Sequence, residues 1–283
     1  MKAAARPGAI SAASSVDKDA LWLAPLEESQ SFASRRRPAA TSSGYPLSMC
    51  GRFARRSTQK LIANWFGIPV EELPVFGPTY NAAPQSFQPI VRRARDTDAR
   101  ELLLSRWGLV PYWAKDAKVG YSTFNARAED LLSKPVFREA FKKRRCLVPA
   151  DAFYEWQRID AKTKRPHAIA LRSGEPYAFA GLWERWKPQD GPPLESFTVI
   201  TTDPNEVTEP LHDRMPVILE PRDYDRWLDP ADPEQPPVDL LRPYPAEKMR
   251  AWPVSERVGN VRNDDPTLLD ESAPEPTTPS LFD

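Results

Sequence analysis

The sequence predicts an α+β protein of one domain, built on a mostly antiparallel, barrel-like β-sheet with short surrounding helices. Many short segments of alternating hydrophobicity recur along the chain, and scattered helical segments separate them without the rhythm of a parallel sheet. Proline accounts for 32 of 283 residues, roughly twice its ordinary share, which favours turns and strand edges over long helices. The hydrophobic content of 41% suits a globular core.

Composition divides the chain into three regions. Residues 1–48 are rich in Ala and Ser and lack hydrophobic periodicity, so we expect a disordered leader, or a start assigned upstream of the true initiator Met49. Residues 49–263 are expected to form the catalytic domain. Residues 264–283 hold six Asp or Glu and no Lys or Arg, which predicts an acidic, disordered tail.

Charge and cysteine content limit the function classes. The two cysteines, Cys50 and Cys146, lie far apart, which argues against a disulfide framework and suits a reducing compartment. We therefore expect a cytoplasmic, nucleoid-associated protein, or a nuclear one in a eukaryote. No apolar run reaches membrane-spanning length. The net charge is zero, but residues 49–263 carry a slight excess of Lys and Arg, which permits contacts to phosphates.

The elements are predicted in order from local signals. Ser57 or Thr58 can cap a short helix that Gly67 ends, and residues 80–84 read as a turn. Strands are expected at residues 87–92, 101–109, 145–148, 152–157, 167–172, 177–183, 197–201, 216–219 and 250–254. Further helices are expected at residues 127–132, 136–143, 205–210 and 222–228.

Cys50 is the candidate chemical centre, because it directly follows Met49. If Cys50 is the first residue of the working protein, its α-amine, with a reference pKa of about 8, lies beside a thiol whose reference pKa is about 8.5. An aldehyde can form an imine with this amine, after which the sulfur closes a five-membered thiazolidine in an intramolecular step. An internal cysteine would be limited to thiolate chemistry.

Two further side chains could move protons. Glu155 lies in the aromatic strand 152–157, where partial desolvation would raise its pKa toward the range useful for acid–base chemistry, although spacing alone slightly favours a solvent-facing glutamate. His212 lies in a loop that enters a strand, where catalytic groups are often displayed. His167 reads as an ordinary strand residue, and Cys146 as a small buried hydrophobe.

Asn125 and the pair Tyr112 and Trp113 are each open to two interpretations. Asn125 could cap a helix or orient a nucleophile. Tyr112 and Trp113 could stack unpaired bases, although aromatic core packing is the commoner role. The two cysteines and two histidines lack the short paired spacing of zinc ligands, so no metal site is predicted.

Six motifs together resemble the SRAP family, the SOS-response-associated peptidases or abasic-site processing proteins. Their order and number make the resemblance specific, and it covers about residues 49–265. The motifs are MCGRF at 49–53, YNAAP at 80–84, WGLVP at 107–111, NARAE at 125–129, FYEW at 153–156 and HDRMP at 212–216.

The resemblance implies a protein that captures the aldehyde of an abasic site in single-stranded DNA as a thiazolidine crosslink. It assigns the nucleophile to Cys50, an orienting amide to Asn125, and proton transfer to Glu155 and His212. It implies no cofactor, and we expect a monomer. The implied DNA contacts are phosphates at Arg52, Arg127 and Arg214, with Tyr112 and Trp113 supporting the strand.

Two other functions stay open at this point. One is a cysteine peptidase that cleaves its own chain so that Cys50 becomes the N-terminal residue. In this sequence the cleavage would have to occur between Met49 and Cys50 and would remove 49 residues. The other is a noncatalytic module for single-stranded DNA, whose binding would be indifferent to the abasic lesion.

Overall fold

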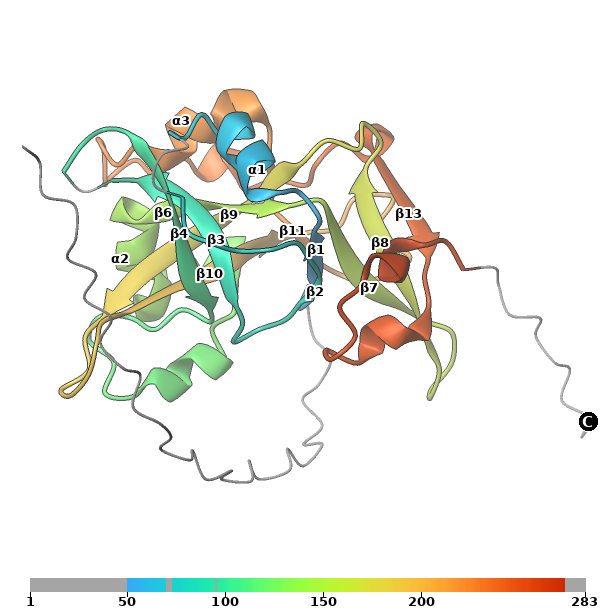
Figure 1. Cartoon of the computed structure of the whole chain (residues 1–283). Coiled ribbons are helices and arrows are strands. Elements are labelled where there is room, and N and C mark those ends of the chain that lie inside the picture. Colours follow the sequence, from blue (N-terminus) through green and yellow to red (C-terminus); the bar gives the residue numbers. More distant parts are fainter. Residues whose placement is uncertain (1–49, 70–72, 95, 273–283) are drawn as a thin grey trace, which may run out of the picture. The chain divides into compact units, whose positions relative to one another are not determined.

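The computed structural model of the protein describes residues 50–69, 73–94 and 96–272. Five of its strands close into a barrel in the order β10, β4, β3, β6, β9 and back to β10 (Figure 1). The β9–β10 pairing closes the ring, and β10 runs parallel to β4. The barrel strands are β3 (Phe87–Arg93), β4 (Arg100–Trp107), β6 (Arg145–Ala150), β9 (Tyr177–Trp186) and β10 (Leu194–Thr202).

A second sheet of five strands has the order β13, β8, β7, β1, β2, and all its pairings are antiparallel. Together with the barrel it confirms the predicted α+β class with a mostly antiparallel, barrel-like sheet. The strands of this sheet are β1 (Phe53–Arg55), β2 (Thr79–Ala82), β7 (Ala152–Arg158), β8 (Lys164–Leu171) and β13 (Met249–Pro253).

Short strands and helices complete the fold. The strand β5 (Asn125–Arg127) lies parallel to β10, while β11 (Met215–Pro216) and β12 (Ile218–Leu219) pair with β10 and β9. None of the described helices has the length and apolarity required to cross a bilayer. The α-helices are α1 (Gln59–Trp65), α2 (Pro135–Lys143) and α3 (Tyr224–Leu228). The 3-10 helices are η1 (Ala117–Tyr121), η2 (Ala128–Asp130), η3 (Pro221–Asp223), η4 (Val238–Leu240), η5 (Ala246–Lys248), η6 (Glu256–Gly259) and η7 (Pro266–Leu269).

Both faces of the barrel wall are buried. Along β6, Cys146 and Val148 belong to one apolar cluster and Leu147 to another, as the two-residue period of a strand requires. The cluster of Leu147 packs against the helices α1 and α3 (Figure 1). Phe66 next to α1 stacks on Tyr224 of α3. The other cluster joins the barrel to the second sheet. Its members include Phe53 of β1, Phe153 of β7, Trp107 of β4 and Phe179 of β9.

Local signals predict several elements correctly. The side chain of Thr58 accepts a hydrogen bond from the backbone N of Leu61 at 3.3 Å and caps α1, and Gly67 follows its end with φ +63°. The helix expected at 136–143 is α2, and Cys146 is fully buried as predicted.

Three element predictions are wrong in part. Residues 79–82 form β2 against β1, so the turn begins only after Ala82. Residues 205–210 form a turn and no helix: the Asn205 side chain caps Val207 and Thr208, and Glu209 N donates to the carbonyl oxygen of Asn205 at 2.8 Å, but this single turn does not continue. Within residues 127–132 the only helix is the 3-10 turn η2.

The predicted tails have different outcomes. Residues 264–272 are ordered, since Leu268 of η7 is fully buried and Glu271 bridges to Val254. The prediction of a disordered tail from residue 264 is therefore wrong for this stretch. Residues 1–48 and 273–283, on which the remaining tail predictions fall, lie outside the described residues.

Among the described glycines, Gly108, directly after β4, has the least room for a side chain. Its φ is +134°, and a Cβ there would overlap the carbonyl oxygen of Gly120 and lie 2.6 Å from Gln85 Nε2. We expect Gly108→Ala to lower the free energy of unfolding by about 2–4 kcal/mol, measured by urea denaturation. Gly259→Ala, which meets no atom within 4 Å, is the control. Equal stability of the two variants would contradict this account.

Candidate active site

Cys50 lies three residues before the start of β1 and is held at three of its atoms. Its backbone nitrogen donates to Glu155 Oε1 at 2.9 Å, and its carbonyl oxygen accepts from Asn125 Nδ2 at 3.1 Å. Its Sγ donates to the carbonyl oxygen of Arg214 at 3.7 Å. Only 4% of the residue is exposed. Burial raises the pKa of the thiol well above its usual range, and the neighbouring Glu155 carboxylate raises it further.

Glu155 projects from β7 opposite His167 of β8. It is 3% exposed, so the interpretation as a solvent-facing glutamate is wrong. Burial raises the pKa of its carboxyl to about 7, an effect that the hydrogen bonds from Cys50 partly offset. A carboxyl with this pKa can both accept and return a proton near neutrality.

His212 lies at the end of a turn that the Asn205 side chain organises, and its backbone nitrogen donates to the carbonyl of Thr208 at 2.9 Å. Its Nδ1 accepts from the backbone nitrogen of Arg214 at 3.0 Å and lies 2.9 Å from Asp213 Oδ1. Burial lowers the pKa of the imidazole and outweighs the opposing effect of Asp213. The lowered pKa favours the neutral imidazole near pH 7.

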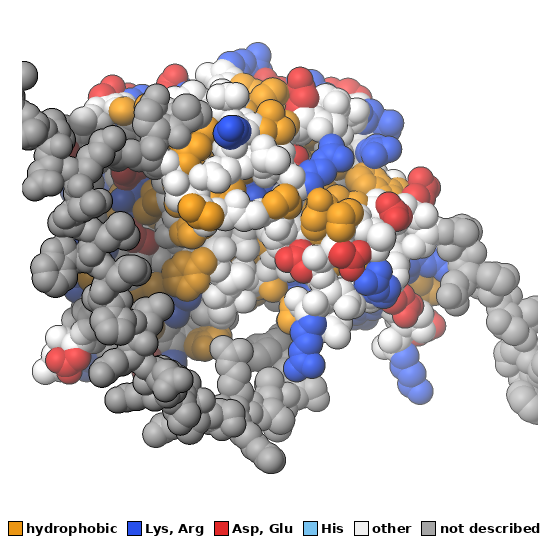
Figure 2. All heavy atoms as spheres, in the orientation of Figure 1, with side chains coloured by type: hydrophobic (Ala, Val, Ile, Leu, Met, Phe, Trp, Pro, Cys, Tyr) orange, Lys and Arg blue, Asp and Glu red, His pale blue; other side chains and the backbone are white. Residues whose placement is uncertain are grey.

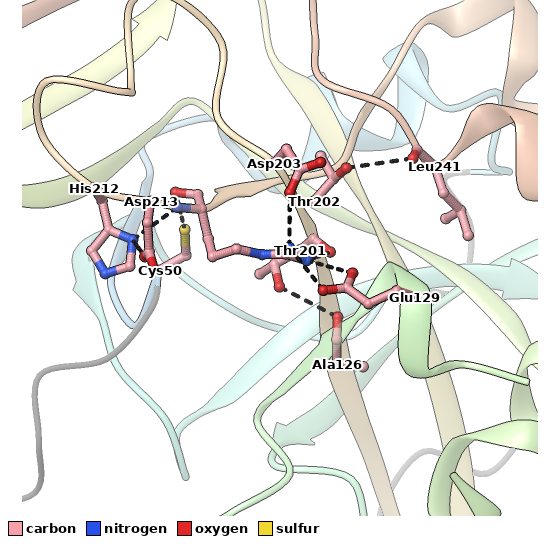
Figure 3. Close-up of polar contacts among 10 residues, drawn as sticks. Cys50, Ala126, Glu129, Thr201, Thr202, Asp203, His212, Asp213 and Leu241 are labelled. Atoms are coloured by element: carbon pink, nitrogen blue, oxygen red, sulfur yellow. Dashed lines mark hydrogen bonds and ion pairs between the residues drawn. The ribbon is translucent and has the colours of Figure 1, made fainter. Parts of the chain in front are cut away.

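The predicted site residues Cys50, Asn125, Glu155 and His212 come together in this way, although they lie on four separate segments. Figure 3 shows Cys50 and His212 near one another. Asn125 belongs to β5, and the N-cap position of η2 is Arg127, so the interpretation of Asn125 as a helix cap is wrong. The backbone of Arg214 links the thiol to the imidazole.

The three predicted phosphate ligands lie in different environments. Arg127 is exposed at the end of β5. Arg52 donates to Asn81 Oδ1 at 2.9 Å and to the carbonyl oxygen of Val258 at 2.8 Å. Arg214 is 7% exposed, and its guanidinium is engaged by acidic side chains of the protein. Of these three residues, Arg127 is exposed, Arg52 is half-buried and Arg214 is buried.

Tyr112 and Trp113 are exposed surface residues, so their interpretation as core aromatics is wrong. They are 58% and 53% exposed and follow β4 after Pro111. Flat aromatic faces in this setting are available for stacking.

Sequence reasoning missed two groups that shape the site. Asn81 Nδ2 donates to the carbonyl oxygens of Val258, Asn260 and Asn263 and so ties β2 to the segment after η6. The role of Asn81 could have been suspected from its place in the motif at 80–84. The role of Glu129 could not, because its partner Arg214 lies 85 residues away in the sequence.

Among residues 50–69, 73–94 and 96–272, no three His, Cys, Asp or Glu side chains gather in a group that could hold a metal ion. Fold and site together define the class: a single-domain α+β barrel protein with a buried cysteine next to a carboxylate at its candidate active site. The chain belongs to the SRAP family, whose model is described as SOS response associated peptidase and matches residues 49–261.

Named relatives are similar over most of the chain. The abasic site processing protein YoqW of Bacillus subtilis is 46% identical over 226 residues, which are 78% of this chain and 99% of YoqW. The abasic site processing protein HMCES of Gallus gallus is 35% identical over 225 residues, covering 69% of this chain and 66% of that protein. A solved structure from Bacteroides thetaiotaomicron has a TM-score of 0.72 at 28% identity and covers 79% of this chain and all of that one.

Proposed function

We propose that the chain, with Cys50 as its first residue, captures the aldehyde of an abasic site in single-stranded DNA as a thiazolidine. The observation that carries this proposal is the 2.9 Å contact between the backbone nitrogen of Cys50 and Glu155 Oε1. In a protein that begins at Cys50, this nitrogen is an α-amine, which must lose a proton before it can attack a carbonyl. The names of YoqW and HMCES support an abasic site as the substrate.

The chemistry follows from the groups around Cys50. The Glu155 carboxylate accepts a proton from the α-ammonium, and the free amine adds to the aldehyde carbon. Glu155 then returns the proton to the hydroxyl of the adduct, which leaves as water and gives a protonated imine. The sulfur adds to the same carbon and its proton passes to solvent, which leaves a neutral thiazolidine. Starting from the ammonium, the complete reaction releases one water and one proton.

Two neighbours, Asn125 and His212, support this sequence of steps. Asn125 fixes the carbonyl of Cys50, which keeps the amine and the thiol in one orientation. His212, held by Arg214 and Asp213, can assist proton transfer at the sugar oxygen that opens to the aldehyde. Nearby residues that bind DNA would bring the abasic sugar to these groups.

The DNA contacts are proposed at Arg127, Tyr112 and Trp113, all exposed. A phosphate would reach Arg52 or Arg214 only by replacing their present partners. On the face seen in Figure 2, Lys and Arg are interspersed with Asp and Glu among the described residues, without one continuous basic field. We therefore expect stacking and a few phosphate contacts to dominate, with a modest dependence on salt.

The family description keeps hydrolysis by Cys50 as the alternative function. A cysteine peptidase requires a thiolate. Here burial and the neighbouring Glu155 carboxylate both raise the pKa of the thiol, which disfavours a thiolate. These observations favour the aminothiol mechanism, in which the thiol reacts after the amine.

The direct test compares two oligonucleotides that differ in one group. The protein beginning at Cys50 should form a covalent product with single-stranded DNA that carries an aldehydic abasic site. It should form none with the same strand carrying a tetrahydrofuran analogue, which lacks the aldehyde. The product is resolved by denaturing electrophoresis. Equal products from both strands, or no product from either, would contradict the proposal.

A further inference from the structure

Two of the three proposed DNA contacts, Tyr112 and Trp113, lie in one loop, residues 108–123, which we call the aromatic loop. It joins β4 to β5 and ends two residues before Asn125 of the site. A loop that is mobile in the free protein must become ordered when DNA binds, which weakens the affinity. The contacts that fix the aromatic loop in the free protein consequently affect how tightly DNA binds.

The side chain of Gln85, which lies outside the aromatic loop, joins its two ends. Its Nε2 donates to the carbonyl oxygen of Gly120 at 2.9 Å, near the end of the loop. The same Nε2 donates to the carbonyl oxygen of Trp107 at 3.4 Å, directly before the loop begins. Oε1 is buried and has no hydrogen-bond partner among the described residues, so the amide is held through its NH2 group alone.

The two ends of the loop also touch each other. A Cβ on Gly120 would lie 2.7 Å from the carbonyl oxygen of Gly108 and 2.8 Å from Arg106 Nη2, so no side chain fits there. A Cβ on Gly108 would lie 2.6 Å from Gln85 Nε2. Gln85 therefore packs directly against this neck of the aromatic loop, where the chain enters and leaves it.

The backbone of Gln85 adopts a conformation that suits glycine better. Its φ is +74°, and it is the one residue other than glycine with a positive φ among the described residues. In this region the Cβ of an L-residue lies too close to the following carbonyl oxygen, whereas glycine has no Cβ. Strain of this kind persists where surrounding contacts fix it, and it is commonest at functional sites. Here the strained backbone carries an amide to the neck of the loop, and a glycine would carry none.

We propose that Gln85 is a positioning residue that closes the neck of the aromatic loop and so holds Tyr112 and Trp113 in the conformation that binds DNA. This inference rests on the proposed function, because that function includes stacking of DNA bases on these two side chains. An amide is suited to the task, since its NH2 group has one hydrogen for each of two carbonyl oxygens and carries no charge.

Hydrogen exchange of the free protein tests the neck without DNA. Gln85→Gly removes the amide and relieves the strain at φ, so the variant should fold. The backbone N–H groups of Leu109 and Ser122, which donate to the carbonyl oxygens of Thr123 and Val119, should exchange at least about tenfold faster than in the unsubstituted protein. The N–H groups between β6 and β9 should keep their rates.

Gln235→Gly is the matched control, because it makes the same change at an exposed position in a turn. Its loop should exchange at the unsubstituted rate. If Gln85→Gly does not fold, Gln85→Asn tolerates the positive φ but is one methylene shorter, and it should show the same faster exchange. Unchanged exchange of the loop in the folded variant would overturn the inference.

DNA binding then separates positioning from a general effect on stability. Gln85→Gly should bind undamaged single-stranded DNA about fivefold or more weakly than Gln235→Gly, because binding must now order the loop. In proteins that begin at Cys50, the two variants should crosslink saturating abasic DNA at the same rate. A lower rate at saturation together with a lower urea midpoint would overturn the inference, because Gln85 would then support the fold as a whole.

Weaker DNA binding with unchanged exchange would also overturn the inference, because it would mean that the amide contacts DNA directly. The exchange measurement needs no DNA. A failure of the proposed function, seen as the absence of a crosslink even in Gln235→Gly, is therefore recognised separately from a failure of the neck.

Discussion

Cys50→Ala should abolish the covalent product with aldehydic abasic DNA. The substitution removes the sulfur and leaves an α-amine, which can form only a reversible imine that hydrolyses during denaturing electrophoresis. The other cysteine, Cys146, is fully buried in the barrel and contributes no atom to the site. Cys146→Ala should therefore crosslink at the wild-type rate and is the matched control.

A second variant separates the amine from the thiol. If one alanine is placed before Cys50 as the first residue, the thiol remains but the α-amine moves to the preceding residue. A five-membered ring can no longer close, so the stable product should again be lost. A product that persists in this variant would mean that thiolate chemistry alone is sufficient, and it would favour the peptidase-like alternative.

Glu155→Gln should slow crosslinking by about 100- to 10,000-fold, the usual contribution of a positioned acid or base. The amide oxygen of glutamine can still accept from the nitrogen of Cys50, which Glu155 Oε1 now does at 2.9 Å. Binding geometry is thereby retained and only proton transfer is lost. Single-turnover rates with saturating abasic DNA measure this effect, because they exclude differences in affinity.

The same substitution should stabilise the fold in alkaline solution. In the chain that keeps residues before Cys50, burial raises the pKa of Glu155 from 4.5 to about 7. The stability that the protonated carboxyl contributes is complete below pH 4.5 and is lost as the pH rises through 7. Since glutamine does not titrate, Glu155→Gln should unfold with a free energy higher by up to about 3 kcal/mol at pH 8.

Denaturant unfolding of the two proteins at pH 4 and pH 8 checks this expectation. A stability difference between them that does not change with pH would show that Glu155 titrates normally.

If the protein were instead a noncatalytic module for single-stranded DNA, Glu155→Ala should leave DNA binding unchanged, and no covalent product should form with abasic DNA.

Local patterns predict the strands and helix ends of this fold well. The alternation at 152–157 and 177–183 corresponds to β7 and β9, and Thr58 and Gly67 mark the ends of α1. The closure of the barrel could not be predicted in this way. It depends on β10 pairing antiparallel to β9 on one side and parallel to β4 and β5 on the other, which no local pattern specifies.

In the candidate site, too, the individual residues could be predicted from local sequence, whereas the contacts between them could not. Cys50 and Glu155 could be predicted as site residues from their sequence neighbours, because Cys50 follows a methionine and Glu155 lies in an aromatic strand. Their contact, across 105 residues, comes from the pairing of β1 with β7. The environment of Arg214 could not be predicted, because Glu129 and Thr201 reach it only after β5 aligns with β10.

The intact mass of the crosslinked product tests the central claim most directly. The protein that begins at Cys50 is joined to an aldehydic abasic oligonucleotide, treated with borohydride, weighed whole and then fragmented. The account predicts the sum of the two masses less one water, unchanged by borohydride, with the adduct on residue 50. An adduct on a lysine, or a mass that gains two hydrogens on reduction as an imine would, contradicts it.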